Sequence, residues 1–201
     1  KAQGKCTTDH ISPAGAWLRF RGHLDKISDN VFSGVVNAYT GEAGRGKNRI
    51  THLPDSFSAI ARHYKKAGRG WIAVGDENYG EGSSREHAAM EPRYLNCRAL
   101  IAKSFARIHE TNLKKQGLLP LWFVDPADYE KIREDDRVSI PDTTLAEGKP
   151  VMVLLTHADG TAETITTRHT YTAEQILWFE AGSLLNKIRR ADEMKNELKR
   201  Y

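Results

Sequence analysis

Short apolar runs separated by polar, glycine-rich segments characterise the middle of the chain. Three of these runs have the length of a strand and are apolar throughout, which is typical of buried parallel strands; they are Trp71–Val74, Ala99–Ala102 and Leu118–Val124. Polar starts and glycine ends predict helices before and between them; these run from Pro54-Asp55-Ser56 to about Ala67, from Ala88 onward, and from Ser104 to Gln116. The alternation of strands and helices predicts a parallel α/β layer.

The second half of the chain shows a different pattern, in which strands dominate. A short helix is expected at Pro126–Arg133, and three further runs predict strands at Arg137–Ile140, Val151–Thr156 and Glu163–Thr167. Asp159-Gly160 lies between the last two and is a strong hairpin signal. Thr172 is expected to cap a helix over Ala173–Ala181, which Gly182 interrupts, and a charged helix follows over Ser183–Tyr201. We therefore expect one domain over residues 1–182, with the helix 183–201 packed on it or extending from it.

The first part of the chain gives weaker signals. Residues 1–30 are rich in polar and turn residues, Val31–Val36 is predicted to be a strand, and Thr40–Lys47 is predicted to be a surface loop because it holds three glycines.

Composition and charge narrow the possible functions. The chain has 201 residues, 39% of them hydrophobic and 28% charged, as expected of a globular protein of one domain with appendages. The net charge of +4 suits an anionic metabolite but does not by itself indicate nucleic-acid binding. No apolar run is long enough to span a membrane. Because the chain begins at Lys1 without a methionine or a signal peptide, it is expected to be a processed or excised piece.

The metal-binding residue types do not form a recognisable site. Cys6 and Cys97 make no pair with zinc spacing and are expected to be buried thiols in a reducing compartment. The eight histidines are scattered. No metal site is therefore expected within this chain.

The most distinctive segment is the glycine loop Gly75–His87, which connects an apolar strand to a helix. Backbone N–H groups at such a junction form an anion site. The loop lacks the lysine of a P-loop, and Arg85 stands where a dinucleotide-binding loop has glycine. A small carboxylate, gripped by the Arg85 guanidinium, is the anion that these residues favour.

Ser83 has two possible roles. Ser83-Ser84-Arg85-Glu86 matches a capping box, in which Ser83 would cap the helix. Alternatively, Ser83 is a reactive hydroxyl whose alkoxide is stabilised by the N–H groups of Ser84 and Arg85 and by the guanidinium. The local sequence leaves both roles open.

Four segments, in this order, resemble aconitase, and most closely the C-terminal swivel domain of the mitochondrial type; they are Cys6–Pro13, Phe20–Asp25, Gly75–Met90 and Lys103–Asn112. The resemblance covers nearly the whole chain and is weakest at residues 38–50 and beyond 159. It implies an α/β fold, the swivelling β/β/α domain of the aconitase and isopropylmalate-isomerase small-subunit type.

The resemblance also implies an activity. Aconitase interconverts citrate and isocitrate through cis-aconitate in the tricarboxylic acid cycle, in the mitochondrial matrix. A [4Fe–4S] cluster in domains 1–3, which lie outside this chain, binds the substrate. By resemblance Ser83 is the catalytic base, Ser84 and Arg85 bind one substrate carboxylate, Arg21 binds another, and Asp9 and Ser12 line the site. No residue of this chain is expected to bind the metal.

Two alternatives to an aconitase domain remain. The chain is expected to be inactive without the cluster domains. Its length also suits the small subunit of a related hydro-lyase such as homoaconitase or isopropylmalate isomerase. It could also be a non-catalytic binding or structural domain that has been recruited to a larger assembly. An assembly that contains RNA is one such case. The basic residues near the C-terminus permit nucleic-acid binding but do not indicate it, because Asp192, Glu193 and Glu197 are interleaved with them.

Overall fold

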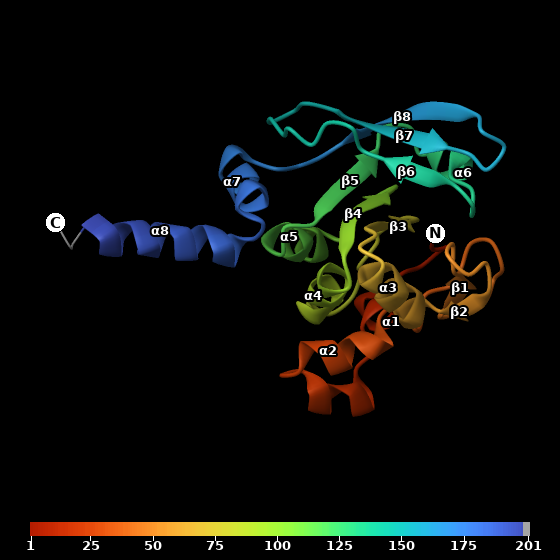
Figure 1. The fold of residues 1–201 in the computed structure, drawn as a ribbon, viewed down its shortest axis with the longest axis horizontal. Coiled ribbons are helices and arrows are strands. Elements are labelled where there is room, and N and C mark those ends of the chain that lie inside the picture. The colour runs from red at the N-terminus through yellow and green to blue at the C-terminus, as the bar shows by residue number, and fades with distance from the viewer. Residues whose placement is uncertain (199–201) are drawn as a thin grey trace.

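The computed structural model describes residues 1–198, in which one six-stranded sheet is flanked by helices (Figure 1). The strand order is β3-β4-β5-β8-β7-β6. The strands are β3 (Trp71–Gly75), β4 (Cys97–Ala102), β5 (Leu119–Phe123), β6 (Arg137–Ser139), β7 (Val151–Thr156) and β8 (Ala162–Arg168). The first three are parallel and the others are antiparallel, so the sheet is mixed and the predicted α/β class is confirmed.

The parallel half of the sheet is buried on both faces, as its apolar sequence predicts. The connecting helices are α4 (His87–Tyr94) and α5 (Arg107–Lys115). In β4, Leu100 belongs to a hydrophobic cluster on one side of the sheet, whereas Ile101 belongs to a second cluster on the other side. A strand that contributes to two cores needs apolar residues at successive positions, which explains the continuous apolar run.

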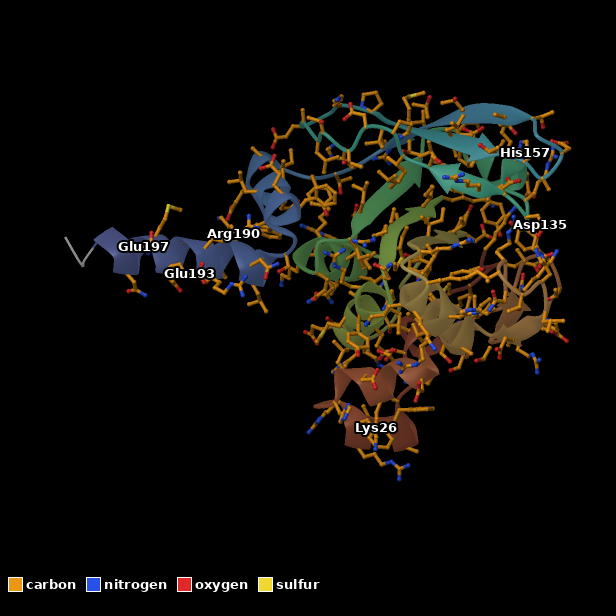
Figure 2. The ribbon with its side chains drawn as sticks, in the orientation of Figure 1. Lys26, Asp135, His157, Arg190, Glu193 and Glu197 are labelled. Carbon is orange, nitrogen blue, oxygen red and sulfur yellow. The ribbon has the colours of Figure 1, made fainter. Side chains whose placement is uncertain are left out.

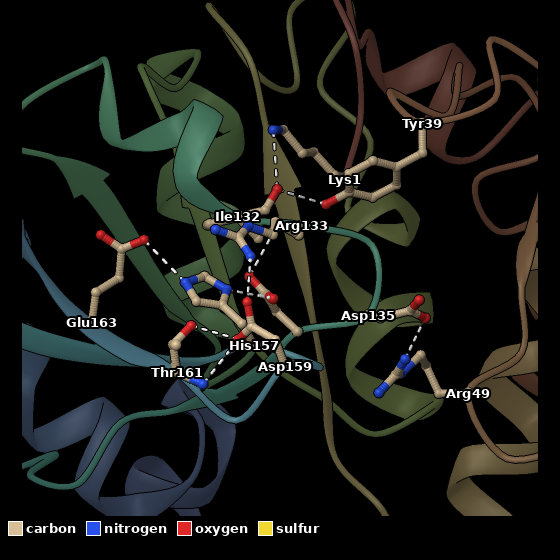
Figure 3. A network of polar contacts seen from close by, with 11 residues as sticks. Lys1, Tyr39, Arg49, Ile132, Arg133, Asp135, His157, Asp159, Thr161 and Glu163 are labelled. Atoms are coloured by element: carbon tan, nitrogen blue, oxygen red, sulfur yellow. Dashed lines mark hydrogen bonds and ion pairs between the residues drawn. The ribbon is translucent and has the colours of Figure 1, made fainter.

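The antiparallel half is built on the predicted hairpin. Strands β7 and β8 pair from Val151↔Thr167 to Thr156↔Ala162, and Gly160 in the turn has a φ of +85°. At the turn of this hairpin, His157 hydrogen-bonds to Asp136 (2.7 Å) and to Glu163 (3.1 Å), and Figure 3 shows the contact with Glu163. The hairpin is thereby tied to the connection between α6 (Asp128–Lys131) and β6.

Two helices complete the C-terminal part. Helix α7 (Ala173–Ala181) begins with a capping box between Thr172 and Gln175 and ends at Gly182, which has a φ of +90°. Helix α8 (Leu184–Leu198) projects away from the sheet (Figure 1), and Arg190, Glu193 and Glu197 lie along it (Figure 2). The rest of the predicted helix, residues 199–201, lies outside the described residues.

The N-terminal part differs from its prediction. Short helical turns and two short strands precede the long helix α3 (Phe57–Lys66); they are α1 (Thr8–Ile11), η1 (Gly15–Phe20), α2 (Leu24–Ile27), η2 (Ser28–Asn30), β1 (Arg45–Lys47) and β2 (Pro54–Ser56).

Two predictions for this part were wrong. Val31–Val36 forms turns rather than a strand, because Phe32 adopts a φ of +59° and donates its N–H to the Ile11 carbonyl. The predicted loop 40–47 ends in β1, which pairs with β2. Within residues 1–198, no helix has both the length and the apolar character required to cross a membrane.

Candidate functional site

The glycine loop 75–87 leaves the carboxyl end of β3 and enters α4 within one residue of the predicted start at Ala88, but later than a cap at Ser83 would place it. Helix α4 begins at His87 with Glu86 as its N-cap, and that cap makes no side-chain hydrogen bond. The capping-box prediction for Ser83 was therefore wrong. Positive φ angles at Gly80 (+82°) and Gly82 (+106°) keep the chain in a loop through this region. The Ser83 side chain is exposed, and among residues 1–198 its hydroxyl makes no hydrogen bond.

The loop is held from both sides by backbone contacts. The Gly80 N–H donates to the Cys6 carbonyl (2.8 Å), and the Thr8 hydroxyl donates to the Ser83 carbonyl (2.8 Å). On the other side, the Tyr79 N–H donates to the Ser104 carbonyl (2.9 Å). Ser104 was predicted to cap α5; instead, its hydroxyl accepts the Asn78 N–H, and Ala106 is the N-cap. The site is thus assembled from three segments that are distant in sequence.

Gly80 occupies a position that no larger residue fits. A Cβ built there would lie 2.1 Å from Cδ2 of His109, which packs against the loop from α5. His109 is 2% exposed, and burial lowers its pKa to about 4, so the ring is neutral at physiological pH. This tight contact fixes the loop against α5.

The Arg85 guanidinium is held by hydrogen bonds to residues in α1 and directly after it. Its Nη1 donates to Asp9 Oδ1 (2.5 Å) and to the Ser12 carbonyl (2.9 Å). The hydrogen bond from Arg85 lowers the pKa of Asp9, and the Ala14 N–H adds a second donor. Since one edge of the guanidinium is used in this way, the rest of it is available to an anion.

Ser12 contributes to the site through its backbone carbonyl. Its side chain is buried, and its hydroxyl donates to Glu91 Oε1 (2.7 Å) on α4. Glu91 is fully buried, and desolvation raises its pKa to about 8, so the carboxyl is mostly protonated at neutral pH. Glu91 was not among the site residues predicted from the sequence. The available signal was a carboxylate between Ala89 and Pro92, residues that lie on the buried face of a short helix.

Arg21 approaches from a separate element, the end of η1. Its carbonyl bonds to Nε2 of His87 (2.8 Å), and its side chain is exposed. No ion pair to Arg21 is present among residues 1–198, so its charge is available to an anion near the start of α4.

Ser83, Ser84 and Arg85 line a small open cavity of about 330 Å³, whereas the other predicted site residues, Asp9, Ser12 and Arg21, do not line it. Thr8, Gly82, Ser83, Ser84 and Arg85 line one side, and residues 106–109 line the other. Asn112, which was not among the predicted site residues, donates from Nδ2 to the Ser84 hydroxyl (3.4 Å). Hydroxyls, loop N–H groups and a guanidinium that face one cavity can hold a carboxylate.

The two thiols do not suit an iron–sulfur cluster. Cys6 and Cys97 are at most 1% exposed, and burial raises the pKa of each to about 12. A cluster needs three or four thiolates, which neither the number nor the protonation state of these residues supplies. Within residues 1–198, no three His, Cys, Asp or Glu side chains are arranged to hold a metal ion.

The chain is thus a mixed α/β domain whose glycine loop presents two serines and an arginine beside a parallel strand. The model of the aconitase C-terminal domain family matches residues 1–126, and the chain belongs to that family. The resemblance found in the sequence is thus confirmed.

Two relatives and one solved structure illustrate the similarity. The mitochondrial aconitate hydratase of Gracilaria gracilis is 58% identical over 190 residues, and the probable mitochondrial aconitate hydratase of Caenorhabditis elegans is 56% identical over 190 residues. Each match covers 94% of this chain but only 24% of the relative, so the chain spans about a quarter of their length. A structure of 3-isopropylmalate dehydratase from Methanocaldococcus jannaschii shares the fold, with a TM-score of 0.60, 23% identity, and coverage of 95% of this chain and 90% of that one.

Proposed function

We propose that this chain is the substrate-binding and base-supplying domain of an aconitate hydratase that interconverts citrate and isocitrate through cis-aconitate. The observation that carries the proposal is the convergence of Ser83, Ser84 and Arg85 on one cavity, with Arg85 fixed by Asp9 and Ser12. The names of the relatives, mitochondrial aconitate hydratases, support a mitochondrial location. Within it, the proposed place of the reaction is the tricarboxylic acid cycle in the matrix.

Each residue has a role that follows from its chemistry. Arg85 and Ser84 bind one substrate carboxylate, and the exposed Arg21 guanidinium binds a second one. Asp9 orients Arg85 rather than meeting the substrate directly, because a carboxylate would repel an anionic ligand. Ser12 holds Arg85 through its carbonyl and is itself held by Glu91.

Ser83 is the proposed base that removes the proton from carbon. A free serine hydroxyl is a weak base, and its alkoxide requires stabilisation. The nearby guanidinium and the loop N–H groups would supply that stabilisation in a site closed to water. Among residues 1–198 the Ser83 hydroxyl has no hydrogen-bond partner, which favours its approach to a substrate.

The [4Fe–4S] cluster belongs to other parts of the proposed enzyme. The residues of this chain do not hold it, so domains 1–3 of the same protein are the proposed partners. Residues 1–201 alone are therefore expected to show no turnover of citrate or isocitrate. Turnover by an iron-free preparation of this chain would contradict the assigned roles.

The test is a Ser83→Ala variant in the full-length, cluster-loaded protein. We expect kcat to fall by about 10²-fold or more, as is typical when a general base is lost, while KM changes little. A matched control is Thr51→Ala, which removes an exposed hydroxyl in the loop before β2. An unchanged kcat in Ser83→Ala would remove Ser83 as the base.

A further inference from the structure

Three polar side chains form a row along one face of helix α4. His87, Glu91 and Tyr94 are spaced four and three residues apart, which places them on the same side of the helix. Helix α4 packs against the short helices α1 and α2 of the N-terminal segment (Figure 1). That segment carries three of the predicted site residues, which are Asp9, Ser12 and Arg21.

Each side chain of the row makes a hydrogen bond to a different part of the N-terminal segment. The contacts are His87 Nε2 with the Arg21 carbonyl (2.8 Å), Glu91 Oε1 with the Ser12 hydroxyl (2.7 Å), and the Tyr94 hydroxyl with Asp25 Oδ1 (3.0 Å). Arg62 of α3 also bonds to Asp25 (2.7 Å), so the end of this segment is held from a second helix. The row therefore fixes the N-terminal segment to the helix that follows the serine loop.

The contact made by His87 has no substitute near Arg21. A carbonyl can only accept a hydrogen bond, so Nε2 of His87 carries the proton that it donates to Arg21. Among residues 1–198, this is the one side-chain hydrogen bond to residues 15–22. No residue of η1 is buried, so the hydrophobic core contributes little to holding this stretch. The place of Arg21 therefore depends on His87.

Helix α4 also fixes the second arginine. Arg85 stands two residues before His87, and its guanidinium donates to the Ser12 carbonyl, while the Ser12 hydroxyl is held by Glu91 one turn along the helix. Arg21 does not line the cavity beside Arg85. The separation of the two guanidinium groups is thus set by the helix to which both segments are bonded.

We propose that His87 is a positioning residue that fixes Arg21 relative to Arg85, so that the two guanidinium groups hold two carboxylates of one substrate. Binding groups must be held within about 0.5 Å of the productive geometry to act together. The inference rests on the proposed function, in which both arginines bind substrate. It goes beyond that function because it assigns the spacing of the two groups to a side chain that has no substrate contact of its own.

The test is a double-mutant cycle in the full-length, cluster-loaded protein, with isocitrate as substrate. Arg21→Ala should raise KM by about 10- to 100-fold, because a hydrogen-bonded contact between charges is lost. His87→Ala should raise KM by about tenfold and leave kcat within about twofold, because it disturbs binding rather than the chemical step. In the Arg21→Ala background, His87→Ala should raise KM no further, since its effect passes through Arg21.

A conservative variant separates positioning from a general loss of structure. The side-chain N–H of His87→Gln can reach the Arg21 carbonyl, so this variant should return KM most of the way to the unmodified value. His52→Asn is the matched control at an exposed histidine, and it should leave KM unchanged, because asparagine tolerates the φ of +60° found there. KM does not depend on the fraction of active enzyme, so partial unfolding of a variant would not imitate the expected result.

Three outcomes would overturn the inference: an unchanged KM in His87→Ala, additive increases in the double variant, or a His87→Gln variant as impaired as His87→Ala. The Arg21→Ala variant by itself tests the proposed function. If it raised KM and His87→Ala did not, the inference alone would fail. If Arg21→Ala left KM unchanged, the proposed substrate contact of Arg21 would fail, and the inference with it.

Discussion

At the scale of single residues, Glu91 is notable because a carboxyl group, which is ordinarily exposed to solvent, is fully buried. It is a carboxyl without exposure to solvent, its Oε2 has no partner among residues 1–198, and it supports Ser12 beneath Arg85. Burial raises its pKa from 4.5 to about 8. Between these values the folded chain keeps a proton that the unfolded chain has lost, so stability falls as pH rises from about 4.5 to 8.

The Glu91→Gln variant removes this titration while keeping the shape of the side chain. Between pH 5.5 and 7.5, the titration of Glu91 should lower the free energy of unfolding of the unmodified chain, measured in urea, by up to about 1.4 kcal/mol per pH unit. The variant should lack that part of the slope and be the more stable of the two at pH 7.5. Parallel slopes in the two proteins would show that Glu91 is ionised in the folded state.

Gly80 gives a second prediction at this scale. Replacement by alanine adds a Cβ that meets His109 and imposes a φ of +82° on a residue with a side chain. Gly41→Ala is the matched control, since its φ is +75° but no atom lies within 4 Å of the added Cβ. We expect Gly80→Ala to lose about 3 kcal/mol or more, and Gly41→Ala only about 1 kcal/mol, in urea unfolding. Equal losses would mean that contact with His109 does not hold the loop.

At the scale of elements, the sequence predicted those whose signals are local. The parallel strands and the β7–β8 hairpin were correct because a buried strand needs an apolar run such as Ala99–Ala102, and a tight turn needs residues such as Asp159-Gly160. The N-terminal turns were missed because contacts from distant segments hold them. The Thr8 N–H, for example, donates to the Glu81 carbonyl (2.9 Å).

In the candidate site, too, some residues could be predicted from local motifs, whereas their contacts depend on segments that are distant in sequence. Ser83, Ser84 and Arg85 could be selected from one motif, as could Asp9 and Ser12 from another. The contact between Arg85 and Asp9 depends on tertiary folding, and so does the role of Glu91. Ser83-Ser84-Arg85-Glu86 has the residue types of a capping box, which is why a cap at Ser83 was considered. The helix begins only at His87, so Ser83 lies too far from its first turn to act as the cap.

The hairpin carries a prediction of its own. His157 directly follows β7, and its hydrogen bond with Asp136, reinforced by the one with Glu163 (Figure 3), raises its pKa above 6.5. Its charged form therefore stabilises the fold fully below pH 6.5, and this contribution is lost as pH rises through the folded-state pKa. His157→Gln should lower Tm more at pH 6 than at pH 9, as measured by circular dichroism. An equal loss at both pH values would show that the ring acts as a neutral hydrogen-bonding group.

At the scale of the whole molecule, the charge pattern and the exposed apolar side chains place α8 outside the core. Leu185, Ile188 and Met194 are 73%, 47% and 61% exposed, and Arg189 pairs with Glu193 on the helix itself (3.7 Å). Gly182, just before the helix, is instead fixed: its carbonyl accepts a bond from Arg93 (3.4 Å), and a Cβ on Gly117 would lie 1.9 Å from it. We therefore propose residues 1–182 as the folding unit, with α8 appended to it.

Two truncations test this boundary. A chain ending at Lys187 removes the exposed length of α8 but keeps the Lys187 side chain, which pairs with Glu174 (3.7 Å). Because it loses little buried apolar surface, its free energy of unfolding should stay within about 0.5 kcal/mol of the intact chain. A chain ending at Thr172 also removes α7, whose Ile176 belongs to the hydrophobic cluster beneath β7 and β8, and should lose cooperative unfolding. If the shorter deletion alone abolished cooperative unfolding, α8 would be part of the folding unit, and the boundary at residue 182 would be wrong.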